Sequence, residues 1–324
     1  MPRSAIASVP SFAKLNLGLQ VIGKRADGFH ELRTVFQSIS LADRLEIEYR
    51  PGRGRRVELE SSVEIADNLV ARAAHALMEA GAIRGEVRFR LTKRIPMGAG
   101  LGGGSSNAAA VLLALPVLAR HPVPLADLHR IAAGLGSDVP FFLYGGSALG
   151  LGRGEDLYPL PEPGPRHALL VTTGIHVSTP EAFAALARPA LIELTPIDLT
   201  NKIGRFQSMA WGLVCAGSEG GGWEAFCEND FEAAVFPRFP LLQSLHRRLS
   251  QLGASPVRMT GSGSALFGVF ASGEACGRAG SAMGKLPPKV DVHKIRFMSR
   301  AQYRAAWRRA LGVHLTESAS WLPE

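Results

Sequence analysis

The sequence has few cysteines, no long apolar run and no long run of like charge. Its three cysteines, Cys215, Cys227 and Cys276, are odd in number and far apart in 324 residues. This spacing excludes a disulfide framework and a cysteine metal site, and it is typical of a reducing compartment. We therefore expect structural cysteines.

Membrane and export signals are also lacking. The longest apolar stretch, residues 108–119, is too short to cross a bilayer and contains Pro116. The first 15 residues have neither a continuous hydrophobic segment nor a cleavage pattern. These features predict a cytoplasmic protein without a membrane partner.

The formal charge is +8, and the excess lies in residues 50–56, 84–94 and 294–309. A basic protein can bind nucleic acid, membrane surface or small polyanions. However, the chain contains none of the compact nucleic-acid motifs and no aromatic platform on a basic strand. Solvated basic faces explain most of this charge, and a polyanionic small substrate is compatible with it.

The chain does have a glycine-rich stretch at residues 96–107, PMGAGLGGGSSN, with five glycines between positions 98 and 104. It follows residues 86–95 (EVRFRLTKRI), which alternate as a strand does, and it precedes a helix-forming segment that we expect to end at Pro116. Glycines allow a ligand to approach the backbone, and a helix N-terminus offers unpaired N–H groups and a positive dipole end. The unit strand–glycine loop–helix therefore predicts an anion site, with phosphate as the expected anion.

Three other interpretations of this loop are weaker. Gly98, Gly100 and Gly103 match a dinucleotide fingerprint, but the acidic residue expected about 20 positions later is missing, since Asp127 lies in a predicted helix. A Walker loop would need lysine where Gly104 stands. A mobile surface loop is rarely followed by a strong helix. We favour a phosphate cradle whose cation comes from elsewhere in the chain.

The remaining patterns predict a chain of two domains with mixed strands and helices. Strands are expected at residues 11–22 and 168–173, and small-residue loops at 215–223 and 259–264. Helices are expected at residues 66–81, 124–135, 229–234 and 240–252, and from Pro180 onward. The first of these helices would be capped by Asp67 or Asn68. Glycine and proline are dense at residues 145–165, where we expect a domain boundary. The basic tail after Arg300 has no assignment.

Three polar residues have two interpretations each. Lys14 lies inside the first predicted strand, where a lysine normally faces solvent, and His30 alone is typical of a surface histidine. Asp138 follows a Gly136–Ser137 turn and precedes an apolar run that we expect to be a strand. It can cap the turn, or it can be a carboxylate in a partly dry site, as general-base chemistry requires.

Taken together, these segments resemble the GHMP kinase superfamily. The glycine loop is similar to its second motif, and the lysine strand and the late small-residue loop are similar to its other two, in the same order from residue 11 to about 270. More narrowly, residues 12–47, GSDVPFF at 136–142 and MTGSGSALFG at 259–268 resemble the 4-diphosphocytidyl-2-C-methyl-D-erythritol kinase family. The tail after Arg300 extends beyond the resemblance.

The resemblance implies a two-domain α/β (α+β) fold with the active site between the domains. The N-terminal domain, residues 1–160, would be of the ribosomal protein S5 domain 2-like type, and the C-terminal domain, residues 161–300, ferredoxin-like. Residues 301–324 stay an unassigned basic tail. The implied activity is ATP-dependent phosphorylation of the 2-hydroxyl of the family's cytidyl substrate, in the non-mevalonate isoprenoid pathway.

The resemblance also implies the site residues. Lys14 and Asp138 match the catalytic pair, the carboxylate taking the proton of a tertiary alcohol and the lysine supplying the cation. Phe29 and His30 match a cytosine-binding pair, with Phe29 standing where the family more usually has tyrosine. Further substrate contacts are Asn16, Thr179 and Phe183, which is expected to stack on the cytosine. The ATP-binding residues are Pro96, Met97, Gly98, Ala99, Gly100, Leu101, Gly102, Gly103, Gly104, Ser105, Ser106, Asn107, Gly261 and Ser262.

No metal ligand follows from the resemblance. Mg²⁺ is expected from the nucleotide chemistry, with Ser105 or Ser106 as candidate hydroxyl ligands. We expect a small-molecule substrate and no nucleic-acid partner, in a monomer or weak homodimer. The alternatives are a GHMP kinase for mevalonate or homoserine, a basic nucleic-acid-binding module and a nicotinamide oxidoreductase.

Overall fold

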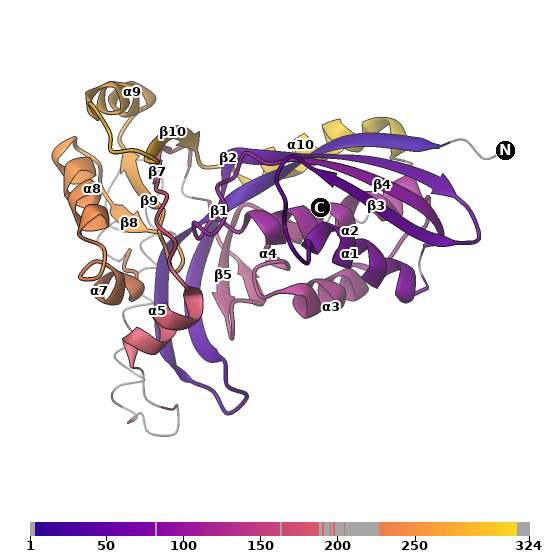
Figure 1. Ribbon diagram of the computed structural model, residues 1–324, viewed down its shortest axis with the longest axis horizontal. Helices are drawn as coiled ribbons and strands as arrows, with labels where there is room; N and C mark the ends of the chain where they lie inside the picture. Colours follow the sequence, from indigo (N-terminus) through magenta and orange to yellow (C-terminus); the bar gives the residue numbers. More distant parts are fainter. Residues whose placement is uncertain are drawn as a thin grey trace.

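The computed structural model describes residues 4–187 except 82 and 163, residues 190, 195, 197 and 204, and residues 227–315. Figure 1 shows two groups of elements, one around each of two sheets, joined by the long strands at the start of the chain. The loop expected at residues 215–223, Cys215 and the end of the basic tail, residues 316–324, lie outside the described residues. Cys227 and Cys276 are both buried, as expected of structural cysteines.

The larger sheet is formed by the N-terminal part of the chain. Its path is β3-β4-β2-β5-β6, and β1 pairs with β2. All pairs are antiparallel except β3 with β4. Its strands are β1 (Ala5–Lys24), β2 (His30–Pro51), β3 (Arg55–Ser61), β4 (Gly85–Thr92), β5 (Ser147–Leu151) and β6 (Asp156–Pro159).

The smaller sheet has the order β10-β7-β9-β8, with antiparallel pairing throughout. Its strands are β7 (His167–Thr172), β8 (Val257–Met259), β9 (Leu266–Phe270) and β10 (Asp291–Arg296). The change from one sheet to the other therefore falls between β6 and β7, near the glycine- and proline-rich stretch of the sequence.

Each sheet has its own set of helices. The core of the larger sheet includes side chains of α1 (Leu69–Glu79), α2 (Gly103–Leu118), α3 (Leu125–Leu135), α4 (Phe141–Tyr144) and α10 (Arg300–Leu311). The core of the smaller sheet includes side chains of α5 (Thr179–Leu186), α7 (Phe231–Val235), α8 (Pro240–Gln251) and α9 (Gly273–Ala282). A short 3-10 turn, η3 (Gly312–His314), follows α10. Among the described residues, none of these helices has the length and apolar character that crossing a bilayer requires.

Most local predictions are confirmed, and two are wrong. Asn68 caps α1, its side chain accepting the Val70 N–H. However, α2 continues past Pro116 to Leu118, because a proline in the last turn removes only one helical hydrogen bond from a helix that is buried on all sides. The apolar run after Asp138 is the short helix α4 and not a strand, since Pro140 already has helical angles and the run ends at a glycine of positive φ, Gly145.

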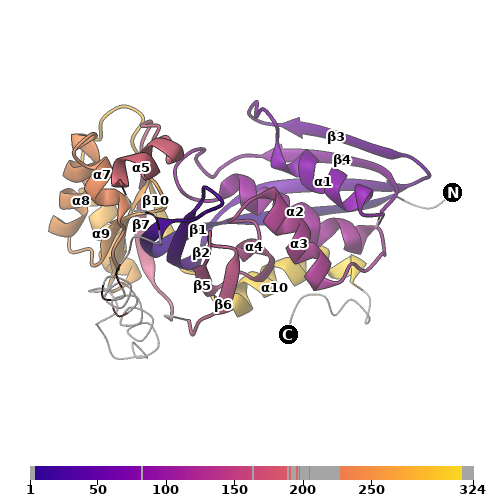
Figure 2. The ribbon, with the colours of Figure 1, turned by 90° about the horizontal axis from the view of Figure 1, so that it is seen from below.

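Helix α10 accounts for the first part of the unassigned tail. It begins with a capping box formed by Ser299 and Gln302. Tyr303, Trp307 and Leu311 recur every four residues, so they share one helix face, and all three are buried in the core of the larger sheet. In Figure 2 this helix lies along the first sheet, so the end of the described chain returns to the N-terminal part.

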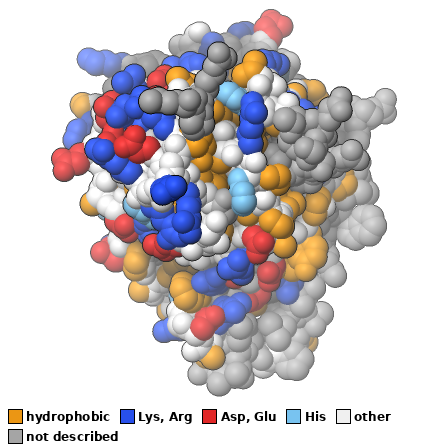
Figure 3. Space-filling view, turned by 90° about the vertical axis from the view of Figure 1, so that its right-hand side faces the viewer, with side chains coloured by type: hydrophobic (Ala, Val, Ile, Leu, Met, Phe, Trp, Pro, Cys, Tyr) orange, Lys and Arg blue, Asp and Glu red, His pale blue; other side chains and the backbone are white. Residues whose placement is uncertain are grey.

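The positive charge of the first sheet is balanced by neighbouring carboxylates. Arginines of β3 and β4 pair with glutamates of β2 and β3, for example Arg88 with Glu58 at 2.8 Å and Arg56 with Glu58 at 2.7 Å. Figure 3 shows side chains of both signs interspersed at this end of the molecule. The basic segments at residues 50–56 and 84–94 therefore do not form a face of one sign there.

A third cluster joins the two sheets. It contains Leu15 and Leu17 of β1, Ala99 and Leu101 of the glycine loop, and Phe267 of β9, all nearly inaccessible to solvent. Because alternate residues of a strand point to opposite sides, Lys14 and Asn16 project away from this cluster. The strand and the glycine loop are thus fixed in one packed unit that supports the site described next.

Candidate active site

Lys14 lies at the centre of β1, next to irregularities in the pairing with β2 at Phe12/Lys14 and Asn16/Gly18. Such bulges redirect side chains and are frequent beside active sites. The Lys14 N–H donates to the Leu101 carbonyl (3.1 Å), which ties the strand to the glycine loop. Its ammonium donates to Asn16 Oδ1 (2.5 Å), and Asn16 Nδ2 donates in turn to Thr34 (2.7 Å). The cation is therefore held in one orientation by protein groups.

Asp138 faces this cation. Its Oδ2 lies 3.4 Å from Lys14 Nζ, and 34% of the aspartate side chain is exposed against 4% for the lysine. The lysine is thus enclosed in protein, while the carboxylate remains open to the cavity. A carboxylate in this position can accept a proton from a bound hydroxyl and remain next to a fixed positive charge.

The glycine loop curves past the Lys14 side chain. Gly98, Gly100 and Gly102 all have positive φ. A Cβ on Gly100 would lie 2.1 Å from the Thr260 carbonyl oxygen, and one on Gly102 would lie 2.8 Å from the Phe142 ring, so larger residues are excluded. Helix α2 starts after Gly102 without a side-chain cap, which leaves its first N–H groups available to a ligand.

A buried polar network supports this loop from behind. Asp43 accepts hydrogen bonds from the backbone N–H groups of Arg94 (2.6 Å) and Ile95 (2.8 Å) and from Asn107 Nδ2 (2.9 Å). It also forms an ion pair with Lys93, whose ammonium donates to Asn107 Oδ1 (3.1 Å). The side chain of Asn107 is thus used within the protein and fixes the start of α2 to the segment that follows β4.

A second loop, residues 259–264, closes on the first. The Asn16 N–H donates to the Thr260 hydroxyl (3.0 Å), which is 3.3 Å from the Gly100 carbonyl. The side chain of Asn229 donates to the carbonyls of Met259 (2.7 Å) and Gly261 (2.8 Å). The loop is therefore fixed on both sides, between β1 and the segment before α7.

Glu232 holds the start of this loop by accepting the Met259 N–H (2.7 Å). Burial raises the pKa of its carboxyl from 4.5 to about 7, although the Met259 hydrogen bond and Arg258 oppose this shift. The folded protein therefore binds the Glu232 proton more tightly than the unfolded chain does.

We expect this proton to make stability depend on pH. As pH rises from about 4.5 to about 7, the unfolded chain loses the proton first, so the free energy of unfolding should fall by up to about 3 kcal/mol. Denaturant titrations at pH 5 and pH 8 measure this difference. Glu232→Gln should remove most of it, and an equal pH effect in both proteins would contradict the assignment.

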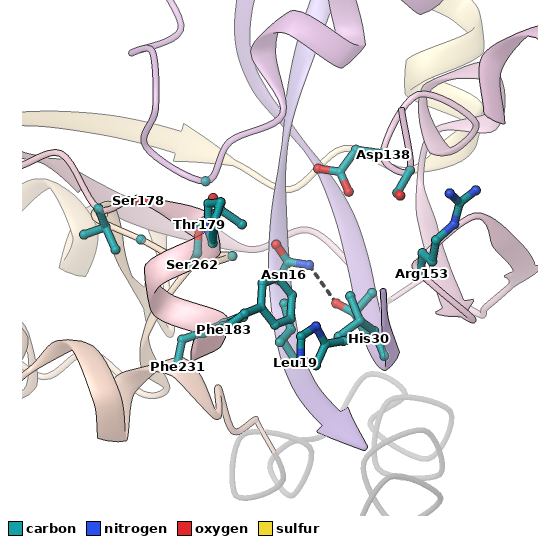
Figure 4. Close-up of a pocket in the computed structure, with 18 of the residues that line it drawn as sticks. Asn16, Leu19, His30, Asp138, Arg153, Ser178, Thr179, Phe183, Phe231 and Ser262 are labelled. Carbon is teal, nitrogen blue, oxygen red and sulfur yellow. Dashed lines mark hydrogen bonds between the residues drawn. The ribbon is translucent and has the colours of Figure 1, made fainter. Parts of the chain in front are cut away.

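The two loops and β1 border a cavity of about 1030 Å³. At its other end the His30 and Phe183 rings are stacked, with centroids 4.4 Å apart and planes inclined by 16°. The edge-on contact of Phe231 with Phe183 supports this pair (4.9 Å). Burial, and then the charge of Lys24, lowers the pKa of His30, so the imidazole is neutral at pH 7, with one donor and one acceptor nitrogen. Figure 4 shows Asp138 and this aromatic pair at separate parts of the same cavity.

The structure brings most of the predicted site residues to this cavity. Its lining includes Lys14, Asn16, Phe29, His30, Gly98, Gly100, Gly102, Asp138, Thr179, Phe183, Gly261 and Ser262. The remaining loop residues are not part of the lining. Ala99 and Leu101 are in the core, Ser106 and Asn107 are buried, and Met97 is 59% exposed.

Several residues of the site were not predicted. Arg153, Lys24 and His176 also line the cavity, and Asn229 positions the second loop. Their sequence context is that of ordinary turns, so no local signal distinguishes them. Among the described residues, no three His, Cys, Asp or Glu side chains gather into a cluster that could hold a metal ion.

Comparisons with known proteins agree with this arrangement. Residues 68–146 match the family described as GHMP kinases N terminal domain, and residues 221–288 match GHMP kinases C terminal. A protein of Solibacter usitatus named 4-diphosphocytidyl-2-C-methyl-D-erythritol kinase is 50% identical over 97% of this chain and 96% of its own length. A protein of the same name from Thermus thermophilus is 40% identical over 84% of this chain and 90% of its own length.

Solved structures give the same result. A crystal structure of 4-(cytidine 5'-diphospho)-2C-methyl-D-erythritol kinase superposes with a TM-score of 0.70 and 37% identity, covering 90% of this chain and 98% of its own. A homoserine kinase from Cytophaga hutchinsonii superposes with a TM-score of 0.68 over 92% of this chain and 96% of its own. At 19% identity, that second likeness concerns the fold alone.

Proposed function

This chain belongs to the 4-diphosphocytidyl-2-C-methyl-D-erythritol kinase family of the GHMP kinases, and we propose how its cavity carries out the phosphoryl transfer of this family. The enzyme transfers the γ-phosphoryl group of ATP to the 2-hydroxyl of 4-diphosphocytidyl-2-C-methyl-D-erythritol, giving the 2-phosphate and ADP in the non-mevalonate isoprenoid pathway. The observation that carries the proposal is that the Lys14–Asp138 pair shares one cavity with both glycine loops and with the His30–Phe183 stack.

Asp138 is the group that takes the proton of the attacking hydroxyl. A tertiary alcohol is a weak nucleophile until a base removes its proton, and Asp138 is the one carboxylate among the described residues that line the cavity. Lys14 orients this carboxylate and stabilises the charge on the transferring phosphoryl group. Asn16 fixes the ammonium in turn.

The nucleotide phosphates bind at the glycine loop and the start of α2, with Gly261 and Ser262 closing over them. Three glycines of positive φ expose the backbone there, and the helix dipole favours negative charge. Mg²⁺ held mainly by phosphate oxygens and water needs only one or two protein oxygens. Among the described residues the buried hydroxyl of Ser106, in the first turn of α2, has no hydrogen-bond partner, so Ser106 rather than Ser105 would supply the protein oxygen for such an ion.

The cytidyl end of the substrate binds at the aromatic end of the cavity. We place the cytosine against the Phe183 ring with its polar edge on His30. The bound cytosine then replaces part of the contact between the His30 and Phe183 rings. The neutral imidazole offers the donor and acceptor that this edge needs. Phe29, which is 51% exposed, contributes a second aromatic face.

Phe183→Ala should raise the KM for the cytidyl substrate about 5- to 150-fold, because stacking of a base on an aromatic ring is worth about 1–3 kcal/mol. The kcat and the KM for ATP should change much less. Phe236→Ala is the matched control, since Phe236 packs on the same core cluster but does not line this cavity. Steady-state kinetics at varied concentrations of the cytidyl substrate test the stacking role of Phe183, and an unchanged KM would refute it.

Turnover assays separate this function from its alternatives. ADP release should be fast with the cytidyl substrate and negligible with mevalonate or homoserine. RNA binding without ATP turnover would favour a nucleic-acid-binding module, although the arginines of the first sheet are paired with glutamates. Because one chain supplies both ends of the cavity, we propose a monomer or weak homodimer, working in the cytoplasm where its cysteines stay reduced.

A further inference from the structure

Arg153 lies in the tight turn between β5 and β6, between two glycines of positive φ, Gly152 and Gly154. Its backbone N–H and its Nε both donate to the Glu155 carboxylate, at 2.7 and 2.9 Å. Burial alone would raise the pKa of Glu155, but the hydrogen bonds and charge of Arg153 outweigh it and the net shift is downward, so the carboxylate stays ionised. The pair is mostly enclosed, with 28% of the arginine and 17% of the glutamate side chain exposed.

The other side of the guanidinium faces the cavity. Its central carbon lies 4.8 Å from the centre of the Phe29 ring, and both residues line the cavity. Within the described part of the chain, its two Nη nitrogens make no hydrogen bond. Figure 4 shows Arg153 on the side of the cavity where Asp138 lies, with His30 below both.

The lining of the cavity contains more basic than acidic side chains. Of the described lining residues, Lys14, Lys24 and Arg153 are basic and Asp138 is the one acidic residue. Lys14 is paired with Asp138, and Arg153 is paired with Glu155, which lies outside the described lining, so the lining itself contains more basic than acidic groups. In Arg153 the Nε is held by the Glu155 carboxylate. The planar fork of its two Nη groups is therefore already oriented before a ligand binds.

We propose that Arg153 binds the diphosphate that joins cytidine to the methylerythritol moiety of the substrate. This inference rests on the proposed function, which puts the cytosine at His30 and Phe183 and the reacting hydroxyl at Asp138. The linker between them then lies within the cavity that Arg153 also lines, on the side of Asp138. A guanidinium fork matches two phosphate oxygens better than an ammonium does. Glu155 acts as a positioning residue for the arginine.

The test compares the binding of cytidine, CMP and CDP by calorimetry, with a non-hydrolysable ATP analogue present so that CDP cannot occupy the nucleotide site. In the unmodified protein, CDP should bind at least 10-fold more tightly than cytidine. Arg153→Met should weaken CDP binding about 10- to 100-fold, the range of a charge-assisted hydrogen bond to phosphate, and should leave cytidine binding within about threefold. Arg153→Lys should restore part of the loss.

Two further variants complete the design. Arg130→Met removes an equal charge from an exposed ion pair on α3 and should leave the binding of all three ligands unchanged. Glu155→Gln should weaken CDP binding by a smaller factor than Arg153→Met and should likewise leave cytidine unaffected. In turnover, Arg153→Met should raise the KM for the cytidyl substrate without changing the kcat or the KM for ATP.

The outcomes separate the two proposals. If Arg153→Met weakens cytidine and CDP by the same factor, the arginine only supports Phe29 and the diphosphate role is wrong. The role is equally wrong if the preference for CDP over cytidine survives the substitution. If the unmodified protein binds neither cytidine nor CDP, the proposed function itself fails, and this inference with it.

Discussion

Asp138→Asn should lower the rate of phosphoryl transfer by about 10²- to 10⁴-fold, the range that general-base catalysis contributes. Asparagine has the same shape, and its amide oxygen can still face Lys14, which lies 3.4 Å away in the unmodified protein. What it cannot do is accept the proton of the attacking hydroxyl. The fold and the affinity for ATP should therefore be preserved while turnover is lost.

The measurement is ADP release in a coupled assay, together with the dissociation constant for an ATP analogue. Asp127→Asn is the matched control, because Asp127 forms an exposed ion pair with Arg130 on α3, away from the cavity lining. It should leave the rate unchanged. If Asp138→Asn keeps more than about a tenth of the rate, the loss is smaller than the contribution of a general base, and Asp138 is not the base.

Lys14→Met should lower kcat by about 10²- to 10³-fold, as expected when a group that stabilises transition-state charge is removed. Methionine fills most of the space of the lysine stem, so the packing beside Gly102 is kept. The ammonium is lost, and with it the cation next to Asp138 and the transferring phosphoryl group. The KM values should change less than kcat, because the interaction is strongest in the transition state.

Steady-state kinetics and a thermal melt test this expectation together. Lys285→Met, on the exposed surface, is the control for loss of one positive charge. The double variant of Lys14 and Asp138 should be little slower than the slower single variant, since residues that act as a unit are not additive. Full additivity would mean that the two residues act separately, and a normal rate in Lys14→Met would remove the lysine from the mechanism.

Local patterns predicted a large part of this architecture. The strand before the glycine loop, the helix after it and the Asn68 cap depend on neighbours in the sequence, so periodicity and capping rules were sufficient. The predictions failed where packing outweighed local preference. Pro116 did not end α2, and the apolar run after Asp138 became α4, since both segments are buried against neighbouring elements.

The roles of side chains in the glycine loop were harder to predict. Every residue from 96 to 107 was assigned to ATP on the basis of the motif, but the structure divides them. Gly98, Gly100 and Gly102 border the cavity, whereas the side chain of Asn107 points into the network of Asp43 and Lys93. A motif records which residues occur together, and it does not record the direction in which each one points.

From the order of its amino acids the chain could be predicted to contain a phosphate-binding glycine loop, because strand, glycines and helix form a short-range pattern. Lys14 and Asp138 had two interpretations each from local pattern, and only the resemblance to GHMP kinases implied that they form a catalytic pair. The contacts between distant parts of the chain, by contrast, bring Lys14 and Asp138, 124 positions apart, face to face, pack α10 into the first core and place Arg153 at the cavity. These outcomes depend on the pairing of distant strands and on the burial of whole elements, and the free energy of such contacts is not carried by any local stretch of the chain.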